Sequence, residues 1–208
     1  MTKFFLTILL ALGLASNAMA MDAPDELVRN VSKDMAETVR NDKAIQAGDI
    51  KRVTEVAETK ILKYFDFQRM TGLAVGREWR NATPEQRTAL ASEFRTLLVR
   101  TYANALAQYK NQTIDVKPLK LAATDTDVTV RTELRQPGSK PIPMDYDMIK
   151  GTDNWKVYDV SVAGVSLVTN YRETFGQEIK ASGIDGLIKS LHDKNQAGAA
   201  KAADTGKK

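Results

Sequence analysis

Apolar residues recur every three or four positions through the first half of the chain, which is the spacing of one face of an α-helix. Over residues 25–43 the main apolar positions lie four apart, and two acidic residues at the start favour a helix N-terminus. The same spacing predicts a second helix over 48–64. Two glycines interrupt the pattern over 65–82, so we expect one or two short helices there.

The strongest helical pattern starts at Thr83 and runs to Lys110. Its first residues combine a threonine N-cap, a proline at the first helical position and Gln86 at the third, which together form a capping box. A wide apolar stripe follows, made up of Leu90, Phe94, Leu97, Leu98, Tyr102, Leu106 and Tyr109. At a rise of ~1.5 Å per residue this helix would be about 40 Å long, enough to cover a whole sheet.

The period of the apolar positions then changes from about 3.6 to 2, which indicates β-strands. Strands are predicted over 126–136, 141–151 and 154–164, and a weaker one over 112–121. The turns between them fall at Pro137 and Gly138 and at 151–154. Short turns between consecutive strands predict an antiparallel meander of about four strands with one buried face.

The end of the chain returns to helical spacing over 166–180 and 184–192. Residues 193–208 are rich in alanine, lysine and glycine, and we expect them to be a disordered tail. The order of elements predicts an α+β fold: N-terminal helices and a long helix packed on a curved antiparallel sheet, closed by C-terminal helices.

Residues 1–20 have the composition of a secretory signal peptide. One basic residue, Lys3, precedes an apolar stretch over 4–14, and Ala18, Met19 and Ala20 fit a cleavage site. The stretch is shorter than the roughly 20 apolar residues that span a bilayer, although an uncleaved anchor helix is the alternative. Because the chain has no cysteine, it lacks a lipoprotein's acylated residue and any thiol chemistry. We expect an exported protein with one domain over 21–192.

The excess of basic residues does not indicate a nucleic-acid-binding protein. The whole chain has a net charge of +4, but Lys3 and the tail hold most of it, and 21–192 carries only about +1. Binding to a phosphate backbone requires a basic stripe, which this distribution does not provide.

One serine lies in a pattern that resembles half of a hydrolase motif. Gly164 and Ser166 begin the G-x-S-x-G sequence of a nucleophile elbow, but Val168 stands where the second glycine is needed. The only histidine, His192, lies near the tail, so neither a serine triad nor a histidine metal site is expected. We interpret Ser166 as the N-cap of the helix that follows it.

Two further groups of charged residues have an ordinary explanation and a functional one. Asp145 and Asp147 share a strand face, as a weak cation site would need, but acids on a solvated sheet face are more common. Three arginines have acidic neighbours, and surface pairing is favoured over ligand capture: Arg77, Arg80 and Arg100 beside Glu78, Glu85 or Glu93. We predict no catalytic residue and no metal site.

The predicted interior is rich in flexible and aromatic residues. Methionine adapts to irregular ligands, but such residues more often form an ordinary core, so a lipid cavity is one of two interpretations. The residues concerned are Met70, Met144, Met148, Phe65, Phe67, Phe94, Tyr102 and Tyr146.

Several stretches, in one order within 25–192, resemble a known family. They are FDFQRMTGLAVGREWRNATPEQRTALASEFRTLLVRTYANAL, YKNQT, NWKVYDVSVAGVSLVTNYRETF and GIDGLIKSL. The most specific pieces are ATPEQ, WKVYDVSVAGVS and GIDGL. Together they resemble the MlaC (toluene-tolerance Ttg2-type) family of periplasmic phospholipid-binding proteins.

This resemblance implies a soluble periplasmic carrier of the Mla pathway, which maintains the lipid asymmetry of the outer membrane. Such proteins hold phospholipid acyl chains in an apolar cavity between a curved sheet and helices, without enzymatic activity and with no cofactor besides the bound phospholipid. The implied partners are an outer-membrane MlaA-type lipoprotein with its porin and the MlaD-type MCE subunit of an inner-membrane ABC transporter. We expect a monomer.

The resemblance supplies no ligand-contacting residues, so the walls of the cavity are predicted from periodicity. They are Phe94, Leu98 and Tyr102 of the long helix with Val128, Val130, Leu134, Ile142, Met144, Tyr146 and Met148 of the strands. Two alternatives are an envelope lipoprotein chaperone or interaction module, which would bind a protein chain, and a serine hydrolase using Ser166.

Overall fold

The structure is a computed structural model that describes residues 21–107 and 111–205. The predicted signal peptide, residues 1–20, lies outside the described residues, as do the predicted end of the long helix at 108–110 and the last three residues. In the described parts of the chain, no helix is both long and apolar enough to cross a membrane.

The first half of the chain is helical, as the apolar spacing predicts. Its α-helices are α1 (Pro24–Asn41), α2 (Lys43–Gln46), α3 (Ile50–Lys60), α4 (Phe67–Val75) and α5 (Pro84–Ala107), and its 3-10 helices are η1 (Leu62–Tyr64) and η2 (Gly76–Arg80). Aspartates cap three of them, because a carboxylate at the N-terminus accepts from backbone N–H groups that lack a partner within the helix. These caps are Asp42, Asp49 and Asp66.

The predicted capping box at the start of α5 is confirmed. The Thr83 hydroxyl accepts a hydrogen bond from the Gln86 N–H at 3.2 Å, and the Gln86 side-chain oxygen accepts one from the Thr83 N–H at 3.0 Å. The reciprocal pair satisfies two N–H groups that the helix itself leaves free, so the start of this helix is fixed by local sequence.

Five antiparallel strands form one sheet in chain order, which confirms the predicted meander. They are β1 (Thr113–Val116), β2 (Asp127–Arg135), β3 (Ile142–Lys150), β4 (Trp155–Val162) and β5 (Val165–Ser166). The fifth strand, of two residues, adds to the four expected. The register shifts between β3 and β4, where Met148 lies opposite Val157 but Asp147 lies opposite Asp159. Tyr158 is thus the extra residue of a β-bulge.

The C-terminal helix α6 (Leu167–Thr205) bends at Gly183, whose φ of 72° and ψ of −177° are reached almost only by glycine. The two helices predicted over 166–180 and 184–192 meet at this bend. The second continues through Thr205, and Asn195 is buried with its side-chain amide donating to the Glu93 carbonyl at 2.9 Å. The stretch predicted to be a disordered tail is thus helical over its described residues, 193–205, and Asn195 contacts α5.

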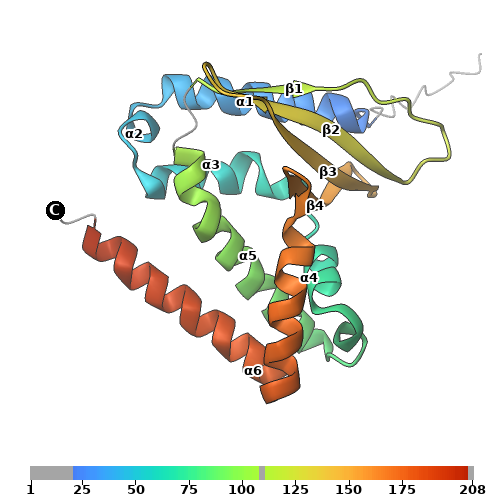
Figure 1. The fold of residues 1–208 in the computed structure, drawn as a ribbon, viewed down its shortest axis with the longest axis vertical. Coiled ribbons are helices and arrows are strands. Elements are labelled where there is room, and N and C mark those ends of the chain that lie inside the picture. Colours follow the sequence, from blue (N-terminus) through green and yellow to red (C-terminus); the bar gives the residue numbers. More distant parts are fainter. Residues whose placement is uncertain (1–20, 108–110, 206–208) are drawn as a thin grey trace, which may run out of the picture.

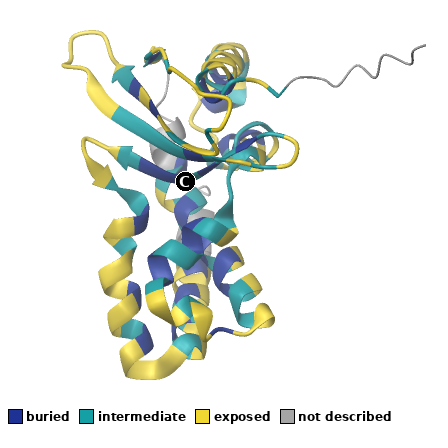
Figure 2. Cartoon of the chain, turned by 90° about the vertical axis from the view of Figure 1, so that its right-hand side faces the viewer, coloured by how far each residue is buried: buried dark blue, intermediate teal, exposed yellow. Residues whose placement is uncertain are grey.

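The α+β class is confirmed, and Figure 1 shows the arrangement: the sheet and α1–α3 gather at one end, and α4, α5 and α6 form a bundle at the other. Buried positions lie on the inward sides of the bundle helices, and exposed ones face outward (Figure 2). In detail, the long helix α5 packs chiefly against α3, α4 and α6, whereas α1 is the helix that lies against β1 and β2. The helices α4 and α6, which pack on α5, also contact β4 of the sheet.

Candidate functional site

One face of the sheet is apolar almost throughout. Residues directly opposite one another on neighbouring strands point to the same side, so each row of paired residues lies on one face. Four such rows cross it and define the apolar sheet face: Val128, Met148 and Val157; Val130, Tyr146 and Val160; Val116, Thr132, Met144, Val162 and Val165; and Ile114, Leu134 and Ile142. The single polar member, Thr132, is buried and donates its hydroxyl hydrogen to the Met144 carbonyl. The Thr132 hydroxyl on this face therefore has a hydrogen-bond partner.

Most of the first two rows is buried, with Val128 and Tyr146 half-buried. Val130 and Met148 have no exposed surface, and Leu27 and Val28 of α1 belong to the same buried cluster. At about 25 cal/mol per Å² of apolar surface removed from water, this packing is a main source of stability for this end of the molecule. The protein itself thus covers most of the apolar surface at the first two rows.

The other two rows end in apolar side chains that the protein does not cover. Ile142 is 41% exposed, Val162 38% and Val165 60%. Leu134 and Met144, which lie opposite Ile142 and Val162 across the strands, are half-buried. We call these five residues the open corner. Contiguous exposed apolar side chains of this kind mark a binding surface more often than scattered ones do.

The structure brings together only part of the predicted cavity wall. All seven predicted strand residues lie on the apolar sheet face. Five belong to the cluster with α1, and three, Leu134, Ile142 and Met144, lie at the open corner, with Met144 belonging to both. The three predicted helix residues lie elsewhere: Phe94 and Leu98 are buried in a second cluster with α4 and α6, and Tyr102 packs against it. These side chains do not form one continuous slot between the sheet and α5.

Two residues of β4 that also lie on the apolar sheet face, Val157 and Val160, were not predicted. A strict alternation places Val157 and Val160 on opposite faces, but the bulge at Tyr158 returns both to the apolar sheet face. The sequence contains a sign of this bulge. Trp155 and Val157 are two residues apart, Val157 and Val160 three apart, and Val160 and Val162 two apart, which indicates one extra residue in the strand.

The opposite face of the sheet is polar and supports the ordinary explanation for its acids. Asp147 accepts a hydrogen bond from the Thr129 hydroxyl at 2.6 Å, which uses this carboxylate within the sheet. Among the residues that the structure describes, no group of three or more histidine, aspartate or glutamate side chains could hold a metal ion. The hydrogen bond from Thr129 is what an ordinary acid on a polar sheet face makes, and it accounts for Asp147.

A tyrosine on this polar face is held by the start of β2. The Tyr158 hydroxyl donates to Asp127 at 2.6 Å, and the Arg69 guanidinium lies 4.3 Å from the centre of its ring. Burial, and then the hydrogen bond to this carboxylate, raises the pKa of Tyr158 to about 12. The phenol is therefore neutral at physiological pH and serves as a hydrogen-bond donor.

Ser166 is the N-cap of α6, as predicted. Its hydroxyl oxygen accepts from the Thr169 N–H at 3.0 Å, and its hydrogen is donated to the buried carboxylate of Asp159. Asp159 also accepts from the Val168 N–H at 3.1 Å. The one histidine, His192, contacts Glu93 at 2.9 Å on α5, so no imidazole activates this serine.

Replacing Asp159 with alanine should destabilise this corner. It leaves a hydroxyl and two backbone N–H groups without their acceptor, and we expect a loss of about 2 kcal/mol in the free energy of unfolding, or a melting temperature lower by about 6 °C. Thermal unfolding followed by circular dichroism measures it. Ser166→Ala, which removes only the cap, should cost about 1 kcal/mol. An Asp159→Ala protein as stable as the parent would contradict this account.

Three comparisons with known proteins agree with one another. The family model described as MlaC protein matches residues 29–193. The chain is 24% identical over 187 residues to the intermembrane phospholipid transport system binding protein MlaC of Haemophilus influenzae, covering 88% of this chain and 87% of that protein. It is 31% identical over 106 residues to toluene tolerance protein ttg2D of Pseudomonas putida, covering 51% of this chain and 49% of that one.

A solved structure is also similar. It is a phospholipid-binding protein from Ralstonia solanacearum in complex with a phospholipid. The TM-score is 0.79 at 37% sequence identity, and the match covers 86% of this chain and 99% of that one. The similarity thus extends over nearly the whole of the lipid-bound protein.

Proposed function

This chain belongs to the MlaC family, and from that premise we propose that it is a phospholipid carrier of the bacterial envelope. The observation that carries the proposal is the similar fold of a relative that was solved with a phospholipid bound. The apolar sheet face, with its open corner, is the part of this chain whose chemistry suits acyl chains.

We propose that the acyl chains enter at the open corner and lie along the third and fourth rows of the apolar sheet face. Met144 supports this role, because an unbranched, flexible side chain adapts to a ligand of irregular shape. Val162 and Ile142 beside it are exposed, and a bound acyl chain would cover them. Phe94, Leu98 and Tyr102 are assigned to the helix cluster and not to the lipid contact.

The energy of burying acyl chains sets how such a carrier works. Each buried CH₂ group contributes ~0.8 kcal/mol, so two chains of roughly 15 such groups give a gross driving force on the order of 20 kcal/mol. Spontaneous release into water would be very slow. We therefore propose that lipid is handed over while the carrier is docked on an acceptor.

The proposed location is the periplasm, on the basis of the predicted signal peptide and the family. The proposed partners are an MlaA-type lipoprotein with its porin at the outer membrane and an MlaD-type MCE subunit of an inner-membrane ABC transporter. In this scheme the protein shuttles phospholipid between the two complexes and so helps to maintain outer-membrane asymmetry.

Protein purified without added lipid should contain phospholipid in roughly equal molar amount. Organic extraction followed by mass spectrometry and phosphate analysis measures it. Folded protein from which no phospholipid can be extracted would contradict the proposal. A co-purified protein chain in its place would favour a chaperone or interaction module, and ester hydrolysis that disappears in Ser166→Ala would favour a hydrolase.

A further inference from the structure

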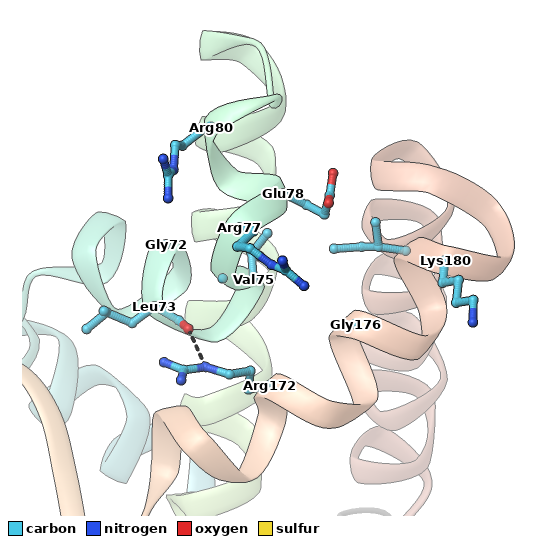
Figure 3. A pocket seen from close by; sticks show the side chains of 11 residues that line it. Gly72, Leu73, Val75, Arg77, Glu78, Arg80, Arg172, Gly176 and Lys180 are labelled. Carbon is cyan, nitrogen blue, oxygen red and sulfur yellow. Dashed lines mark hydrogen bonds between the residues drawn. The ribbon is translucent and has the colours of Figure 1, made fainter.

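A groove of about 920 Å³ lies between α4 and η2 on one side and α6 on the other. Four of its lining side chains are basic and one is acidic: Arg77, Arg80, Arg172 and Lys180 with Glu78. Figure 3 shows Arg77 reaching across the groove toward α6, at Gly176. A Cβ added at Gly176 would meet nothing within 4 Å, so this wall faces open space. We call it the basic groove.

Three of the four cations of the basic groove have no side-chain partner within the described part of the protein. The surface pairs expected from the sequence do not form: neither Arg77 nor Arg80 makes an ion pair or side-chain hydrogen bond with the described residues, and the same holds for Lys180. Arg172 donates its Nε hydrogen to the Leu73 carbonyl at 3.0 Å, which leaves its two terminal nitrogens available. Glu78 accepts from the Asn81 side chain at 2.9 Å.

The backbone of η2, which carries Arg77 and Arg80, is held firmly. Arg87 of α5 donates to the carbonyls of Trp79 at 3.1 Å and Arg80 at 3.2 Å. The Trp79 indole packs against Gly72 so closely that an added Cβ there would lie 3.0 Å from it. A fixed backbone with free cationic side chains loses little conformational entropy when it binds an anion, apart from the ordering of the side chains themselves.

The groove is positively charged, whereas the rest of the domain is net negative. The five charged lining residues sum to +3, whereas residues 21–192 as a whole carry about +1, so the remainder is net negative. An anionic surface would attract this side of the molecule and repel the remainder. The groove therefore gives the protein a preferred orientation.

We propose that the basic groove is a docking site for the phosphate groups of anionic phospholipids at a membrane surface. Guanidinium groups match phosphate oxygens through paired N–H donors, and the recess has room for a headgroup with its glycerol. A protein partner would need about 800 Å² of complementary surface on each side, which a recess between two helical elements suits less well. The proposal rests on the proposed lipid carrier function, and it adds a second site that touches the membrane rather than the cargo.

Vesicle co-sedimentation tests the proposal with the full mature chain. Each basic residue near an anionic membrane contributes about 1 kcal/mol, so Arg77→Gln, Arg80→Gln and Lys180→Gln together should weaken partitioning onto equimolar phosphatidylglycerol and phosphatidylcholine vesicles on the order of 100-fold. Added salt should weaken the parent's binding too. The matched control is Lys33→Gln, Lys51→Gln and Lys140→Gln, which removes three exposed cations outside the groove and should retain nearly full binding.

The outcomes separate this proposal from the carrier function. Loss of vesicle binding with co-purified phospholipid retained supports the docking site. Equal weakening in the control variant, unchanged binding in the groove variant, or binding of the parent only to an acidic protein would each overturn it. Competition by free glycerol phosphate at millimolar concentration, with no vesicle binding by the parent, would instead assign the groove to a soluble phosphate compound and overturn the membrane docking. A parent protein that contains no phospholipid would contradict the carrier function. Its binding to vesicles would still test the docking site.

Discussion

Replacing Phe94 with alanine is expected to lower the free energy of unfolding by about 4 kcal/mol, the largest effect of any change considered for this protein. The ring has no exposed surface and lies edge-on to two others, Tyr171 at 5.0 Å and Phe175 at 5.1 Å between centroids. Truncation removes the buried ring, leaves a cavity and breaks both aromatic contacts, each of which contributes about 1 kcal/mol.

Urea unfolding followed by circular dichroism measures this loss, and lipid analysis of the folded fraction completes the test. Because Phe94 lies in the helix cluster, the amount of phospholipid per folded protein should stay unchanged. Phe94→Leu, which keeps most of the buried volume, should lose roughly half as much stability. A stable Phe94→Ala protein that had lost its phospholipid would place this ring in the lipid site and contradict the division into two clusters.

This residue also shows where sequence-based prediction reached its limit. The apolar stripe of α5 and the apolar face of the strands were both visible, but periodicity identifies a buried face and not the element that buries it. The stripe and the strand face could in principle pack on each other. In the structure Phe94 meets α6 from far along the chain, and Val130 meets α1 instead. Such non-local pairing has no local signature.

The features predicted correctly are those fixed by neighbours in sequence. The reciprocal hydrogen bonds of Thr83 and Gln86 and the cap at Ser166 depend on residues three apart, so a short motif specifies them. The C-terminal stretch was missed for the opposite reason. Its composition is that of a disordered segment, and its order comes from a tertiary contact, in which the Asn195 side chain bonds Glu93 of α5.

A lysine pair at the open corner should remove most of the bound phospholipid while leaving the fold intact. In Met144→Lys with Val162→Lys, both ammonium groups would lie where we place the acyl chains, and a charge beside hydrocarbon costs several kcal/mol. Each 1.4 kcal/mol is a factor of ten, so we expect the phospholipid content to fall more than about tenfold. Met144 is half-buried and Val162 is 38% exposed, so the empty protein can direct both ammonium groups to water.

The matched control is Leu121→Lys, because this leucine is 41% exposed, close to the exposure of Val162, but lies in the loop before β2 rather than on the apolar sheet face. It should keep both its phospholipid and its melting temperature. If the lysine pair melts like the parent and still co-purifies with a full complement of phospholipid, the acyl chains do not pass through the open corner. Equal loss in both proteins would show that any added charge suffices, which would also remove the corner from the site. Only selective loss in the corner variant locates the lipid on rows three and four of the sheet, where the protein leaves its own apolar side chains uncovered.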